Sequence, residues 1–135
     1  MNTDPAAYVG LVVVSHSARI ADGTAELAGQ MAGPEVRIVP AGGMADGAIG
    51  TDAARIAEAI GQADAGAGVV VLADLGSAVL ATRTALELIG GPENVRLSRG
   101  PIVEGAVIAA VQASTGSDLD EVLAAAEGAA FLPKG

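Results

Sequence analysis

The sequence has no cysteine, one histidine (His16), one lysine (Lys134) and two aromatic residues, Tyr8 and Phe131. Without cysteine the chain can form neither disulfides nor thiolate metal sites, and a single histidine is too few for a multi-histidine metal cluster. Recognition of single-stranded nucleic acid by base stacking needs more than two rings. We therefore expect no metal, no cofactor and no sequence-specific nucleic-acid binding.

Basic residues are also scarce, because seven Lys and Arg stand against sixteen Asp and Glu, a formal net charge of −9. Nucleic acid and anionic membranes repel such a chain. The longest stretches without Asp, Glu, Lys or Arg, Pro5–Ala18 and Gly105–Ser117, are shorter than the roughly 18 residues of a membrane span. No basic residue precedes Arg19, so a secretory signal is not expected. The sequence predicts a cytoplasmic protein with no membrane partner.

Hydrophobic residues make up 51% of the 135 residues, which excludes intrinsic disorder and suits one domain over residues 1–135. Strand and helix patterns alternate, and the apolar runs lack the polar alternation of a half-exposed strand. These patterns predict an α/β fold with a parallel sheet covered by helices on both faces. The expected strands are Tyr8–Ser15, Val36–Val39, Gly68–Ala73 and Val95–Ser98; the expected helices are Arg19–Met31, Ala53–Asp64, Ser77–Ile89, Ile102–Ala113 and Ser117–Ala130.

In open parallel sheets the ligand site lies at the carboxyl ends of the strands. His16 follows the first predicted strand, and Asp74 follows the third. A carboxylate that bonds one ring nitrogen fixes the tautomer and leaves the other nitrogen free as a nucleophile. His16 and Asp74 are therefore the candidate catalytic pair. A loop histidine can also be a surface or capping residue, and an aspartate here can simply cap the next helix.

Small residues beside this pair are candidates for binding a phosphate. Gly76 and Ser77 open the third predicted helix and offer backbone N–H groups and a hydroxyl to an anion. The glycines after the second strand allow close backbone approach, although an ordinary turn explains them equally well. The candidate phosphate-binding residues are Ser17, Gly42, Gly43, Gly76 and Ser77.

This set of residues suits a transient phosphohistidine better than other chemistries. The nucleotide-binding pattern GxxxxGK[ST] is absent, and no GxGxxG follows the first strand. A glycosidase needs a second carboxylate beside Asp74, and the sequence reveals none.

Four segments resemble one known family, in its order and spacing: Val12–Gly23 around His16, Ile49–Ala53, Asp74–Ala78 and Pro101–Gly105. That family is the phosphotransfer subunits of dihydroxyacetone kinases, which are relatives of the mannose-type sugar phosphotransferase component A. The resemblance covers essentially the whole chain. It implies a four-stranded, mainly parallel sheet and a homodimer.

The resemblance also implies a function. His16 would accept a phosphoryl group from the histidine-containing phosphocarrier protein and pass it to ADP on the kinase's nucleotide-binding subunit, which serves the dihydroxyacetone-binding subunit. In the mannose-type relatives an aspartate at the position of Asp74 orients the histidine. Some members carry further phosphocarrier domains; because this sequence stops at Gly135, we expect those partners to be separate proteins.

Two alternatives remain: a component A that feeds a sugar permease, and a regulatory module that uses phosphohistidine as a signal. For the homodimer, the predicted helices Ser77–Ile89 and Ile102–Ala113 suggest a location, because charged residues are rare on them. A helix that is apolar nearly all round is expected to be buried, so we predict these two helices at the dimer interface. A tightly packed, alanine-rich core is the alternative explanation.

Overall fold

The computed structural model describes residues 7–135, in which four strands alternate with helices. The strands are β1 (Gly10–Ser15), β2 (Ile38–Gly42), β3 (Val69–Ala73) and β4 (Val95–Leu97). The helices are α1 (Ala18–Ala32), α2 (Ala53–Ala63), α3 (Gly76–Leu88), α4 (Ile102–Ser114) and α5 (Leu119–Gly128), with a short 3₁₀ turn at Ala129–Phe131. Within residues 7–135 no helix combines the length and apolar character needed to cross a membrane.

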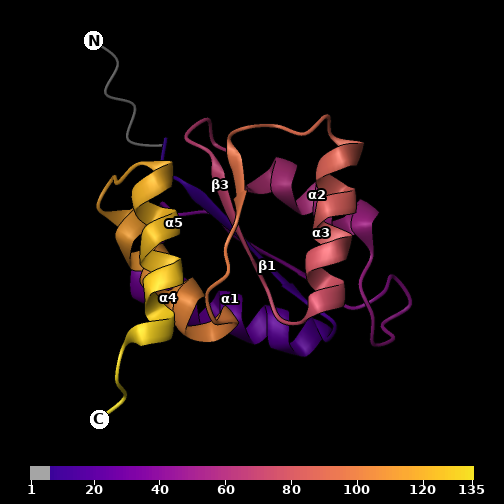
Figure 1. Ribbon diagram of the computed structural model, residues 1–135, viewed down its shortest axis with the longest axis horizontal. Helices are drawn as coiled ribbons and strands as arrows, with labels where there is room; N and C mark the ends of the chain where they lie inside the picture. Colours follow the sequence, from indigo (N-terminus) through magenta and orange to yellow (C-terminus); the bar gives the residue numbers. More distant parts are fainter. Residues whose placement is uncertain (1–6) are drawn as a thin grey trace.

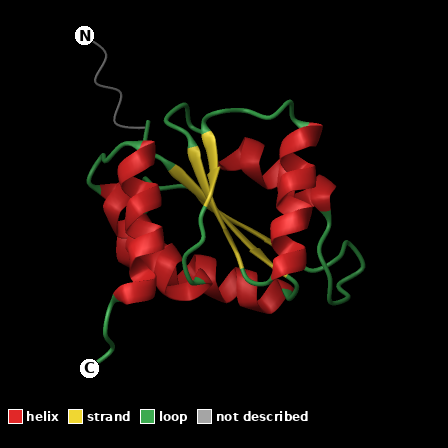
Figure 2. Ribbon diagram, in the orientation of Figure 1, coloured by secondary structure: helices red, strands yellow, loops and turns green. Residues whose placement is uncertain are grey.

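The strands form one sheet in the order β2-β1-β3-β4, and all three neighbouring pairs are parallel (Figure 2). Every residue of β1 is buried, as expected for a central strand that is covered on both faces. The predicted α/β class and parallel sheet are therefore confirmed.

Helices cover both faces of the sheet. Figure 1 shows α4 and α5 on one side and α2 and α3 on the other. The side chains of β1 alternate between two cores: Leu11 and Val13 pack with α1, α4 and α5, whereas Val12 and Val14 pack with α2 and α3. Both layers are rich in alanine, and these small side chains let the helices approach the sheet closely.

The strand order reverses direction between β1 and β3, because β2 lies on one side of β1 and β3 on the other. The loops that leave two such strands diverge to opposite faces and leave a crevice at the carboxyl edge. His16 follows β1 and Asp74 follows β3 at this edge. The topology therefore places the two predicted catalytic residues beside each other.

The second strand differs from the prediction, since β2 runs from Ile38 to Gly42 rather than from Val36 to Val39. Its register with β1 continues through Pro40 to the pair Ser15–Gly42. Proline and glycine suggested a loop, but β2 is an edge strand, where a missing N–H is tolerated on the open side. A smaller error concerns α5, which begins at Leu119, after the cap formed by Asp118 with Glu121, rather than at Ser117.

The helix α4 owes its apolar character to packing inside the monomer. It lies in one layer with α1 and α5, and Ala106, Ala109, Ala110 and Ala113 are fully buried. The helix α3 lies on the opposite face of the sheet, where it packs beside α2. The alanine-rich core therefore explains the buried side of α4. The homodimer and its expected interface on α3 and α4 stay predictions.

Gly42 is a position where the fold leaves no room for a side chain. A Cβ there would lie 2.7 Å from the Ala21 Cβ and 2.7 Å from the Ser17 carbonyl oxygen. Both neighbours belong to the start of α1, so this glycine lets β2 end against that helix.

We expect Gly42→Ala to lower the free energy of unfolding by about 1–3 kcal/mol, because the new methyl group overpacks a rigid contact. The matched control is Gly61→Ala in α2, where a Cβ would meet nothing within 4 Å. There alanine should stabilise by about 0.5–1 kcal/mol through helix propensity. Urea denaturation of both variants measures the difference, and equal stabilities would contradict the packing explanation.

Candidate active site

The imidazole of His16 is held by the carboxylate of Asp74. Its Nδ1 lies 2.9 Å from Oδ1 of Asp74, and the side chains are only 20% and 14% exposed. A carboxylate accepts, so this contact favours the tautomer with the proton on Nδ1 and a free lone pair on Nε2. The sequence prediction that these two residues meet agrees with this geometry.

Asp74 is itself fixed by four donors. Its Oδ2 accepts from the Ser15 hydroxyl at 2.8 Å and from the His16 amide at 3.1 Å. Its Oδ1 accepts from the Leu75 amide at 2.8 Å as well as from the ring of His16. Partial burial by itself would raise the pKa of Asp74, but these hydrogen bonds outweigh it and hold the pKa below its usual value. Asp74 is therefore ionised at neutral pH.

Asp74 is not the cap of the following helix. The N-cap position of α3 is Leu75, which makes no side-chain capping bond. The carboxylate of Asp74 instead points back to β1, where it binds Ser15 and His16. The capping explanation that the sequence left open does not fit this geometry.

Ser15 is a site residue that sequence reasoning missed. Its side chain is fully buried at the end of β1, where its hydroxyl donates to Asp74 and accepts from the Ser17 amide at 3.0 Å. The available signal was a lone hydroxyl at the end of an otherwise apolar strand. Ser15 holds the carboxylate that holds His16, so it is a positioning residue.

We expect Ser15→Ala to raise the pKa of Asp74, because the carboxylate loses a hydrogen bond that favours its charged form. The titration of the Asp74 carboxyl carbon, followed by NMR, measures this shift. Stability should fall by about 1–3 kcal/mol, the cost of a lost charged hydrogen bond. Ser15→Thr keeps the hydroxyl and should restore the low pKa. An unchanged Asp74 titration in Ser15→Ala would refute the positioning role.

The second ring nitrogen of His16 faces the start of α3. Nε2 contacts the Ser77 hydroxyl, which can donate to its lone pair. Gly76 and Ser77 are the first two residues of this 13-residue helix. Within residues 7–135 their amides donate to no other protein group. A group attached to Nε2 would therefore meet one hydroxyl and the positive end of a helix.

The other candidate phosphate-binding residues serve the backbone around His16. The Gly43 amide donates to the Ser15 carbonyl at 3.1 Å, so this donor is already engaged. The Ser17 hydroxyl caps α1 by accepting from the Ile20 amide at 3.4 Å. Gly42 and Gly43 are buried. Of the five predicted phosphate-binding residues, Ser77 contacts the free ring nitrogen and Gly76 precedes it at the start of α3, whereas Ser17 and Gly43 make backbone hydrogen bonds and Gly42 packs against α1.

The arrangement contains no candidate metal site. Within the described part of the chain, no group of three or more histidine and acidic side chains lies close enough to hold an ion. The chemistry available is that of an oriented imidazole with an ionised carboxylate behind it.

Comparisons with known proteins point to one family. Residues 10–123 match the EIIA-man family model, described as PTS system fructose IIA component. The "PEP-dependent dihydroxyacetone kinase, phosphoryl donor subunit DhaM" of Escherichia coli (strain K12) is 45% identical over 121 residues, which are 85% of this chain and 25% of that protein. A "PEP-dependent dihydroxyacetone kinase 2, phosphoryl donor subunit DhaM" of Listeria innocua is 37% identical over 85% of this chain and 94% of that protein.

One solved structure, named "Crystal structure of unknown function protein EF1359", superposes with a TM-score of 0.79. Its sequence is 36% identical, and the alignment covers 90% of this chain and 94% of that one. The chain spans only about a quarter of the length of the first curated relatives, but nearly all of the Listeria relative.

Proposed function

Because this chain belongs to the EIIA-man family of PTS components, we propose that it carries a phosphoryl group on His16 as the phosphoryl donor subunit of a dihydroxyacetone kinase. One observation supports this most directly. Asp74 occupies Nδ1 of His16, while Nε2 faces the uncapped start of α3. This geometry suits a nucleophilic ring nitrogen beside a site for phosphoryl oxygens.

In the proposed first step, the Nε2 lone pair attacks the phosphorus of a phosphohistidine on the histidine-containing phosphocarrier protein. The new Nε2–P bond forms as the carrier's N–P bond breaks, and the released electron pair stays on the carrier's ring nitrogen. The ring of His16 gains positive charge, which the ionised Asp74 stabilises through Nδ1–H. The amides of Gly76 and Ser77 offset the charge of the transferred oxygens.

In the proposed second step the phosphoryl group leaves His16. A β-phosphate oxygen of ADP, bound on the kinase's nucleotide subunit, attacks the phosphorus, and the Nε2–P bond breaks with its electron pair returning to His16. The ATP so formed would phosphorylate dihydroxyacetone on the third subunit. This acceptor is proposed because curated relatives 37% to 45% identical carry the name of dihydroxyacetone kinase phosphoryl donor subunits. The exchange is proposed to take place in the cytoplasm.

A reconstituted system tests the function. With phosphoenolpyruvate, enzyme I and phosphocarrier protein, we expect one acid-labile phosphate per chain, and ³¹P NMR should assign it to Nε2. Adding the kinase subunits with bound ADP should remove the label and form dihydroxyacetone phosphate. Failure of the wild-type chain to accept phosphate would refute the proposal.

A second candidate is component A of a sugar permease, which the fructose IIA description of the matching family model favours. It uses the same phosphohistidine but passes it to a permease component. Label that moves to permease component B, and stays on the chain when the kinase subunits are added, would select this candidate.

A further inference from the structure

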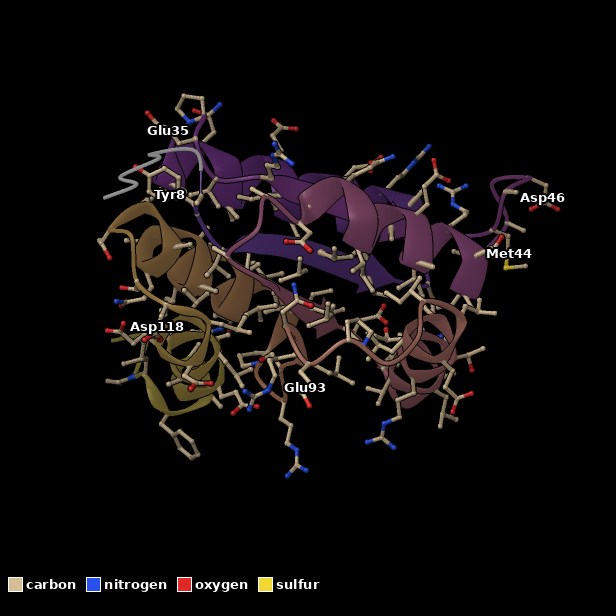
Figure 3. The ribbon with its side chains drawn as sticks, turned by 90° about the horizontal axis from the view of Figure 1, so that it is seen from above. Tyr8, Glu35, Met44, Asp46, Glu93 and Asp118 are labelled. Atoms are coloured by element: carbon tan, nitrogen blue, oxygen red, sulfur yellow. The ribbon has the colours of Figure 1, made fainter. Side chains whose placement is uncertain are left out.

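A cavity of about 540 Å³ lies between α3 and the end of β4, and we refer to it as the α3–β4 cavity. Figure 3 shows where this part of the chain runs: the labelled Glu93, two residues before β4, lies between α5 and α3. The cavity is lined by Val79, Arg83 and Leu86 from α3, and by Leu97, Ser98 and Arg99 at the end of β4. None of these six residues belongs to the catalytic pair or to the candidate phosphate-binding residues, so the cavity is separate from the candidate active site.

The walls of the cavity follow from the sequence of α3 and from the position of β4. The strand β4 has only three residues and forms an edge of the sheet, so within residues 7–135 no strand lies beyond it. Val79, Arg83 and Leu86 are spaced four and three residues apart, which places them on one face of α3. Val79, Leu86 and Leu97 are only partly buried. The cavity therefore offers an aliphatic surface that the fold itself leaves incompletely covered.

Two guanidinium groups and no carboxylate line the cavity, those of Arg83 and Arg99. Within residues 7–135 the arginine side chains that form hydrogen bonds are Arg37, Arg55 and Arg96, and neither cavity arginine takes part in a side-chain hydrogen bond or an ion pair. The whole sequence has sixteen Asp and Glu but only seven Lys and Arg. The cavity is therefore a positive region on an acidic protein, and such a region attracts anions.

Hydrogen bonds fix the backbone at the end of β4. The Ser98 amide donates to the Val71 carbonyl at 2.8 Å, and the Ser98 hydroxyl accepts from the Gly100 amide at 2.9 Å. The Arg99 amide donates to the Glu127 carboxylate at 2.9 Å. Ser98 is only 5% exposed, and within residues 7–135 its hydroxyl proton has no acceptor. This wall of the cavity is therefore preformed and has a hydroxyl that can donate to a ligand.

A second cavity, of about 330 Å³ beside β2 and α2, lacks this excess of positive charge. Arg55 lines it, but so does Glu58. The Arg55 guanidinium also donates to the Met44 carbonyl at 3.5 Å. This second cavity gives no reason to expect an anion, and the α3–β4 cavity is the stronger candidate for a ligand site.

We propose that the α3–β4 cavity binds a small organic phosphate, a phosphate monoester with an apolar body. The proposal goes beyond the proposed function, because it requires no phosphorylation of His16. The guanidinium fork of arginine matches phosphate oxygens, and the two positive charges of Arg83 and Arg99 match the double negative charge of a monoester. The apolar body would cover the aliphatic side chains. The volume lies within the range of about 300–1,000 Å³ that is usual for small-molecule sites.

Titration of the ¹⁵N-labelled chain with phenyl phosphate at neutral pH, followed by amide chemical shifts, tests this site. Inorganic phosphate and benzoate are titrated separately, because the first lacks the apolar body and the second has a single negative charge. The cavity variant is Arg83→Gln/Arg99→Gln. The control variant Arg37→Gln/Arg96→Gln removes the same two positive charges outside the cavity, where the Arg96 guanidinium pairs with Asp120 of α5. Thermal unfolding checks that both variants fold.

We expect phenyl phosphate to shift the amides of Val79–Leu86 and of Leu97 and Ser98, and to bind more tightly than inorganic phosphate or benzoate. The cavity variant should bind phenyl phosphate about tenfold or more weakly, the effect of lost charged hydrogen bonds, whereas the control variant should match wild type. Shifts confined to Gly76 and Ser77 would mean that the probe occupies the candidate active site instead, and would overturn the inference. An unchanged affinity of the cavity variant, an equal loss in the control variant, or equally tight binding of inorganic phosphate or benzoate would also overturn it.

Discussion

His16→Ala should accept no phosphate from the carrier protein, so its phosphotransfer activity should be lost completely. No other imidazole exists in the sequence, and the Ser15 hydroxyl, which also binds Asp74, is fully buried. The fold should survive, because the side chain of His16 lies at the carboxyl edge outside both apolar cores. The backbone bonds of His16 to Asp74 and Gly50 remain available in the variant.

Acid-labile labelling and thermal unfolding, measured on the same preparation, check this expectation. His16→Gln is the companion variant, because its amide keeps a polar group beside Asp74 without a phosphorylatable ring nitrogen. His16→Gln should be as inactive as His16→Ala, and its melting temperature should be closer to that of wild type. Label that persists in either variant would remove His16 from the proposed mechanism.

Asp74→Asn should slow phosphotransfer by about tenfold or more, within the usual range for a positioned acid–base partner. The amide keeps the shape of the side chain but carries no charge to stabilise the imidazolium on His16. Its N–H₂ group would also face donors, since the His16 and Leu75 amides both point at the carboxylate. We expect a loss of about 1–3 kcal/mol of stability from this mismatch.

The pH dependence of stability shows whether the charge on Asp74 stabilises the fold. The pKa of Asp74 is lower in the folded protein than its ordinary value of 3.8, so the carboxylate stabilises the fold at pH values above 3.8. This contribution disappears as the pH falls through the folded-state pKa. The stability gap between wild type and Asp74→Asn should therefore be widest near neutral pH and shrink in acid, as urea titrations at several pH values can measure.

Asp52→Asn is the matched control. Asp52 caps α2 at the same edge of the sheet, where its carboxylate accepts from the Ala54 and Arg55 amides. Asparagine is an equally good cap, so this variant should keep both transfer and stability. If Asp74→Asn transferred phosphate at the wild-type rate while losing stability, Asp74 would have a structural role alone.

Local sequence patterns were enough to predict the fold class and the meeting of His16 with Asp74. The run from Gly10 to Ser15 is apolar without alternation, and only a strand between two helical layers buries such a run on both sides. Because parallel strands end at one edge, His16 and Asp74 could be expected to meet from their places after β1 and β3. The family resemblance of these same segments agreed with the match over residues 10–123.

Interpretation failed where a residue's partner is far away in the sequence. Pro40 and Gly42 suggested a loop, but pairing with β1 extends β2 through both. The charge-poor helix α4 suggested a dimer interface, which stays a prediction, but its buried alanines pack with α1 and α5 within the monomer. A local pattern shows how apolar a segment is and which backbone conformation it prefers. It does not identify the segment that pairs with it or buries it.

The amino-acid sequence was sufficient to predict the alternation of strands and helices, the parallel sheet and the meeting of the candidate catalytic residues His16 and Asp74. These depend on hydrophobic periodicity and on positions along the chain, which are local properties. The tertiary structure was needed to show that Ser15 supports Asp74 and that the Gly43 amide donates to the Ser15 carbonyl. Each of these depends on the direction of a single group toward a partner far along the chain, and that direction is fixed only when both cores have packed.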